Sequence, residues 1–93
     1  MTDLVSVQAI VYGYVQGVLF RDYVFRRATE LGLTGYVRNL PGRSVEVNAE
    51  GRKKQLEKLI GYCKVGPPMA EVDKVVVNWS EYSGKFSHFS ISY

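Results

Sequence analysis

Apolar and polar residues alternate along much of the chain, and this period of two is typical of half-buried β-strands. Residues 4–14 give the clearest case, because Val7, Ala9 and Val11 all fall on one face of the expected strand. Between turn signals, similar patterns predict further strands. These lie at residues 35–40, 44–50, 72–79 and 86–93.

Two other stretches repeat their apolar residues every three or four positions, which indicates amphipathic helices. The first begins near residue 21 and ends at Gly32, a residue that commonly stops a helix. The second spans roughly residues 52–64. Their apolar stripes are Phe20, Val24, Ala28 and Leu31 in the first, and Leu56, Leu59, Ile60 and Cys63 in the second.

The predicted element order is β-α-β-β-α-β, with an extra short strand at the end. Two helices of this size can cover one face of an antiparallel sheet, and right-handed crossovers then favour a split βαβ arrangement. The fold class predicted is therefore α+β, a ferredoxin-like two-layer sandwich with both helices on one face. We expect residues 1–93 to form a single domain, since 93 residues are too few for two.

The composition of the chain indicates a folded domain and bears on where the protein is located. The 46% hydrophobic content suits a folded core, and no apolar run approaches the ~20 residues of a membrane-spanning helix. The first residues do not resemble a secretory signal, and Cys63 has no second cysteine to pair with. We expect a cytoplasmic protein, a monomer, with no membrane partner.

The net charge of +3, from 12 Lys and Arg against 9 Asp and Glu, is mildly basic and compatible with a small anionic ligand. The densest basic run, residues 52–54, is interpreted as a solvated helix face. An RNA-binding module of the same fold is a rival, but it would carry aromatic residues on its third strand. The expected third strand, residues 44–50, has two glutamates and no aromatic residue, so we expect no nucleic-acid partner.

Residues 13–21 join the first strand to the first helix and form the most informative segment. A short strand-to-helix loop can turn successive backbone N–H groups toward one point, and the free amides and dipole of the helix N-terminus add to such an anion site. Gly13 and Gly17 permit the necessary backbone angles, and Arg21 at the helix start can grip two phosphate oxygens at once. Many such loops bind nothing, so the residues alone leave both interpretations open.

Two motifs resemble the signatures of the acylphosphatase family. The first is Gly13-x-Val15-Gln16-Gly17-Val18-x-Phe20-Arg21, and the second is Gly35-Tyr36-Val37-Arg38-Asn39-Leu40-Pro41 followed by Val45-Glu46-Val47. The remainder of the chain agrees, with Gly66-Pro67-Pro68-x-Ala70-x-Val72, Trp79, Gly84, Phe86, Phe89, Ile91 and Tyr93 in the family's order. The resemblance covers nearly the whole chain and implies the ferredoxin-like fold.

The resemblance also implies an enzyme that hydrolyses the carboxyl–phosphate bond of acyl phosphates to carboxylate and inorganic phosphate. In such enzymes the loop backbone and an arginine hold the phosphoryl group, and an asparagine orients the attacking water. The matching residues in this sequence are Arg21 and Asn39. The loop residues are Val15, Gln16, Gly17, Val18, Leu19 and Phe20. The expected partners are small acyl phosphates as substrates and inorganic phosphate as product and inhibitor, with no metal and no cofactor.

A carboxylate leaving group departs without being protonated, so positioning and electrostatic stabilisation can carry the reaction. This agrees with a sequence that shows no nucleophile motif and no cluster of metal ligands. His88 and Cys63 are interpreted as structural residues, and Asp22 as a first-turn residue that could tune Arg21. The chain departs from the family at Gly42-Arg43, where an Asp-Gly pair is usual, although Pro41-Gly42 still suits a type II turn.

One further alternative stays open from the sequence. A sensor or partner-binding domain could keep the anion pocket without turnover. Related domains also occur inside larger carbamoyl-transfer proteins, whereas this sequence contains one domain, and we expect a free enzyme.

Overall fold

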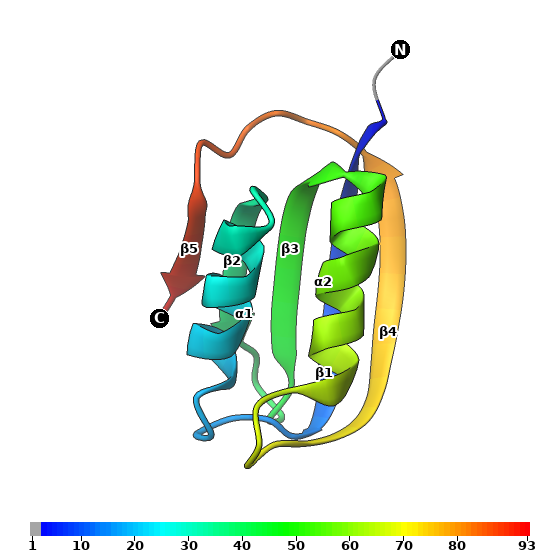
Figure 1. Cartoon of the computed structure of the whole chain (residues 1–93). Coiled ribbons are helices and arrows are strands. Elements are labelled where there is room, and N and C mark those ends of the chain that lie inside the picture. Colours follow the sequence, from blue (N-terminus) through cyan, green and yellow to red (C-terminus); the bar gives the residue numbers. More distant parts are fainter. Residues whose placement is uncertain (1–2) are drawn as a thin grey trace.

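The computed structural model describes residues 3–93, which form two helices packed on a five-stranded sheet (Figure 1). Both helices lie on the same face of the sheet, so the predicted α+β two-layer sandwich is confirmed. The elements in chain order are β1 (Leu4–Tyr14), α1 (Phe20–Glu30), β2 (Thr34–Asn39), β3 (Val45–Arg52), α2 (Lys53–Val65), β4 (Glu71–Glu81) and β5 (Phe89–Ser92).

The strands lie in the order β4-β1-β3-β2-β5. β1 pairs antiparallel with both β3 and β4, and β2 pairs antiparallel with β3. β5 runs parallel to β2, so the sheet, which was expected to be antiparallel and is mostly so, departs from that pattern at this edge. The reason is that the chain crosses one end of the sheet from β4 to the opposite edge before β5 begins, as Figure 1 shows.

β5 is also shorter than the predicted strand of residues 86–93, because it begins only at Phe89. The preceding residues belong to the crossing connection. Ser83 and Gly84 donate their backbone N–H groups to the carboxylate of Glu50, over 2.9 and 3.0 Å, and the Ser83 hydroxyl donates to the same group over 2.7 Å. A buried acidic side chain of β3 therefore holds this connection against the sheet.

Glu50 and Glu46 are buried on the sheet face that the helices leave uncovered, with exposed fractions of 2% and 4%. Burial alone would raise the pKa of Glu50, but hydrogen bonds from Ser83 and Gly84 outweigh it and hold the pKa below its ordinary value. Burial acts on Glu46 in the same way, and hydrogen bonds from Gln8 and Arg38 again leave its pKa lowered. Both carboxylates are thus held in their charged form.

The core lies between the helices and the sheet. Alternate residues of β1, β2 and β3 meet the apolar stripes of α1 and α2 there, as the two periodicities predict. Its largest fully buried side chains are Phe20, Leu56, Leu59, Val7, Val11, Val15, Val24, Val37, Val45, Val47 and Cys63. Within residues 3–93, no helix has the length and apolar character needed to cross a membrane.

Candidate active site

Three segments that are far apart in the sequence end at the same end of the sheet. The loop of residues 15–19 follows β1, Asn39 ends β2, and Tyr93 follows β5. Between them lies a cavity of about 280 Å³. It is lined by Val15, Gly17, Leu19, Arg21, Asp22, Asn39, Ile91 and Tyr93.

Buried side chains anchor the loop and the first residue of α1. Val15, Val18 and Phe20 are buried in the core, which fixes the path of the backbone between them. Gly17 and Leu19 have positive φ angles of 72° and 63°. This conformation is uncommon for a bulky residue such as leucine, and the Leu19 side chain is 76% exposed. Core packing thus holds an unusual backbone turn beside the cavity.

The N-terminus of α1 opens onto the same cavity. Leu19 occupies the N-cap position in a left-handed conformation, and its side chain makes no capping hydrogen bond to the helix. Tyr23 donates the first helical hydrogen bond, to the Leu19 carbonyl. The amides that precede it in the first turn have no carbonyl partner within the helix and, with the helix dipole, favour an anion at this point.

Arg21 supplies a positive charge in the cavity, and its side chain is oriented by contacts with Ser92 of β5 and with Tyr93. Its Nη1 donates to the backbone carbonyl of Ser92 over 3.2 Å. Its guanidinium carbon lies 4.7 Å from the centre of the Tyr93 ring, within the range of a cation–π interaction. The neighbouring Asp22 pairs with Arg26 over 3.1 Å, one helical turn away. Arg21 is therefore oriented by a backbone carbonyl and an aromatic ring, and the nearby carboxylate has a partner of its own.

Asn39 faces the loop from the end of β2. Its side chain lines the cavity, and its Oδ1 is buried without a hydrogen-bond donor among residues 3–93. A buried acceptor of this kind is rare in folded proteins and calls for an explanation. If Asn39 served only to satisfy backbone groups near the hairpin, this oxygen would accept one of their N–H groups.

The chain is similar to known proteins over most of its length. The family model described as acylphosphatase matches residues 7–91. The chain belongs to the acylphosphatase family. An acylphosphatase of Caldivirga maquilingensis is 51% identical over 90 residues, covering 96% of this chain and 95% of the relative.

Solved structures give the same result. The crystal structure of an acylphosphatase from Bacillus subtilis matches with a TM-score of 0.92 and 35% identity, covering 96% of this chain and 99% of the other. An acylphosphatase from Coxiella burnetii matches with a TM-score of 0.85 and 37% identity, covering 97% and 94%. The resemblance read from the two motifs is confirmed, and so is the predicted activity, the hydrolysis of acyl phosphates.

The structure of this acylphosphatase separates the six predicted loop residues into two groups. Val15, Gly17 and Leu19 line the cavity together with the predicted Arg21 and Asn39. The other three, Gln16, Val18 and Phe20, are not among its lining residues. Val18 and Phe20 face the core, so any part they play in phosphate binding is through the backbone.

Two lining residues, Ile91 and Tyr93, were not predicted as site residues. The parallel register of β5 with β2 brings them there, because Ile91 lies opposite Val37 and Ser92 opposite Arg38, one residue before Asn39. Both residues belong to the matching tail of the sequence, which was the available signal. Nothing in the periodicity indicates that the last strand joins this edge.

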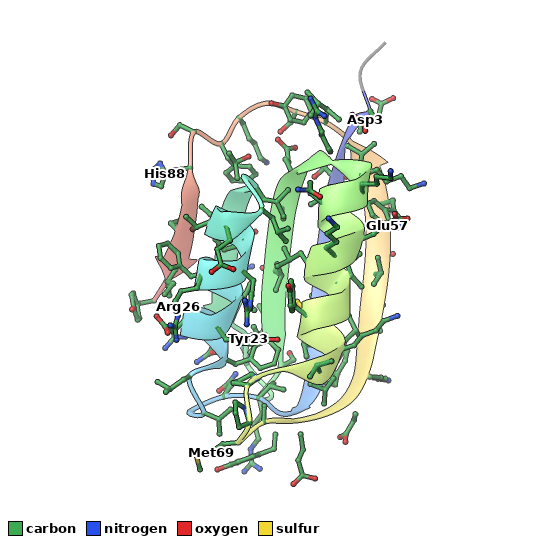
Figure 2. The ribbon with its side chains drawn as sticks, in the orientation of Figure 1. Asp3, Tyr23, Arg26, Glu57, Met69 and His88 are labelled. Atoms are coloured by element: carbon green, nitrogen blue, oxygen red, sulfur yellow. The ribbon has the colours of Figure 1, made fainter. Side chains whose placement is uncertain are left out.

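The remaining candidates from the sequence lie away from the cavity. Figure 2 shows His88 at the start of β5, and its ring is within 3.0 Å of the Ser87 hydroxyl. Cys63 is buried in the core, and burial raises the pKa of its thiol to about 12, so a reactive thiolate is disfavoured. In the described part of the chain, no group of three or more His, Cys, Asp or Glu side chains gathers to hold a metal ion.

Proposed function

We propose that this acylphosphatase holds the phosphoryl group of its substrate with the backbone amides of residues 15–20 and with Arg21, while Asn39 orients the attacking water. The observation that carries the proposal is the placement of Asn39 opposite the loop and Arg21 in one cavity, with its Oδ1 free of any donor among the described residues. An amide carries an acceptor at one end and donors at the other. A half-turn about the terminal torsion exchanges the two ends, so either can serve the reactants.

The reaction is a displacement at phosphorus. The water oxygen forms a bond to phosphorus, and the bond from phosphorus to the acyl oxygen breaks, so that the carboxylate leaves with the electron pair. Both protons of the water stay with the phosphate product. Because carboxylic acids have a pKa of about 4, the leaving group needs no proton at neutral pH and the site needs no general acid.

Charge in such a transition state is spread over the phosphoryl oxygens, and fixed positive groups stabilise it. Arg21 and the first-turn amides of α1 supply these groups within a small cavity. The same groups suit inorganic phosphate, which we propose as the product that also inhibits. We propose small acyl phosphates as substrates and a monomer in the cytoplasm, without metal, cofactor, nucleic-acid or membrane partners.

The test is phosphate release from benzoyl phosphate in the presence of EDTA, comparing the wild type with Asn39→Ala. We expect Asn39→Ala to lower kcat by about 10²–10³-fold, as for loss of a positioned polar group elsewhere, with little change in phosphate affinity.

Thermal unfolding gives the fraction of folded enzyme. A destabilised variant with normal kcat per folded molecule would assign Asn39 to structure, and loss of wild-type activity in EDTA would contradict a metal-free reaction. Phosphate binding without turnover would instead indicate a sensor.

A further inference from the structure

Gln16 lies in the phosphate loop, yet its side chain joins the loop to a different segment. Its Nε2 donates to the backbone carbonyl of Leu40 over 2.9 Å and to that of Ser44 over 2.8 Å. We infer that this side-chain amide is a positioning group that sets Asn39 at its working distance from the phosphate loop. The inference rests on the proposed role of Asn39.

The two acceptors flank the base of the β2–β3 hairpin. Leu40 directly follows Asn39, and its N–H donates to the Ser44 carbonyl over 2.8 Å. The Ser44 oxygen therefore accepts from both Leu40 and Gln16, which uses both of its lone pairs. The two protons of one amide nitrogen thus tie down both chains of the hairpin.

The β2–β3 ladder ends just before the residues that Gln16 contacts. Asn39 and Val45 form the last pair of the β2–β3 ladder. The tip beyond it is exposed at Pro41, Gly42 and Arg43. Gln16, which is 24 and 28 residues away in sequence from its two acceptors, links this hairpin to the loop that faces it.

A displacement of about 1 Å in a reacting group can lower a rate by about 10²-fold. Loss of the Gln16 tie should move Asn39 while leaving the loop amides and Arg21 in place, since Val15, Val18 and Phe20 anchor the loop in the core. The expected signature is therefore a fall in kcat without a matching fall in phosphate affinity. A residue that bound phosphate directly would lower both.

The experiment uses Gln16→Met, which keeps the length of the side chain and removes both donors. We expect kcat for benzoyl phosphate to fall about 10-fold per folded molecule, with the dissociation constant of inorganic phosphate nearly unchanged. The side-chain NH₂ signals of Asn39 should also shift in the NMR spectrum.

Gln8→Met is the matched control, because Gln8 donates to Glu46 on the uncovered face of the sheet over 2.7 Å. It should lose stability and keep its kcat.

The double variant Gln16→Met with Asn39→Ala decides whether Gln16 acts through Asn39. If it does, Gln16→Met should change kcat little once Asn39 has been removed, because coupled residues are not additive. An equal fall in both backgrounds would overturn the inference, as would a normal kcat or a weakened phosphate affinity in Gln16→Met alone. Failure of the proposed function is seen separately, as a normal kcat in Asn39→Ala by itself.

Discussion

Within residues 3–93, a strand leads into a helix at two junctions, and both junctions carry basic residues. At the first, β1 leads through residues 15–19 to α1 and Arg21; at the second, β3 ends at Arg52 and α2 starts at Lys53 without a loop. The cavity beside the second junction is the larger, at about 540 Å³ against about 280 Å³. By size and positive charge alone, the second junction would be the stronger candidate for an anion site.

The difference lies in the backbone and in what faces it. Arg52 is extended, with φ −69° and ψ 137°, so the chain passes directly from strand to helix. The Lys53 N–H already donates to the carbonyl of Asp3, a residue that Figure 2 shows at this end of the molecule. The first junction instead turns through two positive φ angles, at Gly17 and Leu19, and meets a neutral amide, Asn39, across the cavity. These two differences, in loop geometry and in the opposing polar group, favour the first junction as the anion site that we propose.

We expect the largest change in activity when the arginines of the two junctions, Arg21 and Arg52, are replaced one at a time. Arg21→Ala should lower kcat/KM for benzoyl phosphate about 10³-fold, because a fixed positive charge is lost from the transition state. The fold should survive, since Arg21 lies outside the apolar core. Arg52→Ala is the matched control at the second junction and should retain near wild-type activity. Similar losses in both variants, measured by phosphate release, would show that overall charge rather than the first site drives the reaction.

Much of this contrast could be predicted from the sequence. The glycines of residues 13–21 and the position of Arg21 indicated the first junction, and the charged run of residues 52–54 was correctly interpreted as exposed. The core residues of both helices followed from their spacing, because burial of one face imposes that period.

Other features depend on contacts between distant segments, which no local pattern encodes. The parallel pairing of β5 brings Tyr93 to Arg21, and the tie from Gln16 to Leu40 and Ser44 joins residues far apart in sequence. A glutamine in a polar loop has many possible partners. The sequence motif indicated that Gln16 belongs to the site, but only the fold shows which atoms its amide reaches.

Glu50 lies next to the second junction, and we expect its carboxylate to stabilise the fold and to play no part in the reaction. Glu50→Gln should lower the free energy of unfolding by about 1–3 kcal/mol, since an amide cannot accept all of the hydrogen bonds from Ser83 and Gly84. Urea unfolding measures this loss, while kcat per folded molecule should stay normal. Glu57→Gln, on an exposed position of α2, is the control.

The same substitution predicts a pH dependence. The pKa of Glu50 is lowered in the folded state, so its stabilising contribution is complete above the unfolded pKa of about 4.3 and is lost as the pH falls through the folded value. The difference in stability between wild type and Glu50→Gln should therefore be larger at neutral pH than in acid. A difference that stays constant or grows on acidification would contradict this role of the carboxylate.

The smallest effect is expected at the hairpin tip. Arg43 has a φ of 73°, in the region that favours glycine. Arg43→Gly should relieve about 1 kcal/mol of backbone strain and add some entropy to the unfolded chain, for a net gain of about 0.5 kcal/mol. Thermal unfolding should show a slightly raised Tm with unchanged kcat. A clear loss of stability would show that the arginine side chain has a structural role here.

Titration of the ¹⁵N-labelled enzyme with inorganic phosphate tests the central claim most directly, because backbone amide signals report each junction separately. We expect saturable shifts in the amides of residues 15–21, and none in the first turn of α2. The shifts should weaken strongly in Arg21→Ala. Saturable shifts in α2 instead, or none in the loop at phosphate concentrations that inhibit the enzyme, would contradict the assignment of the phosphate site to the first junction.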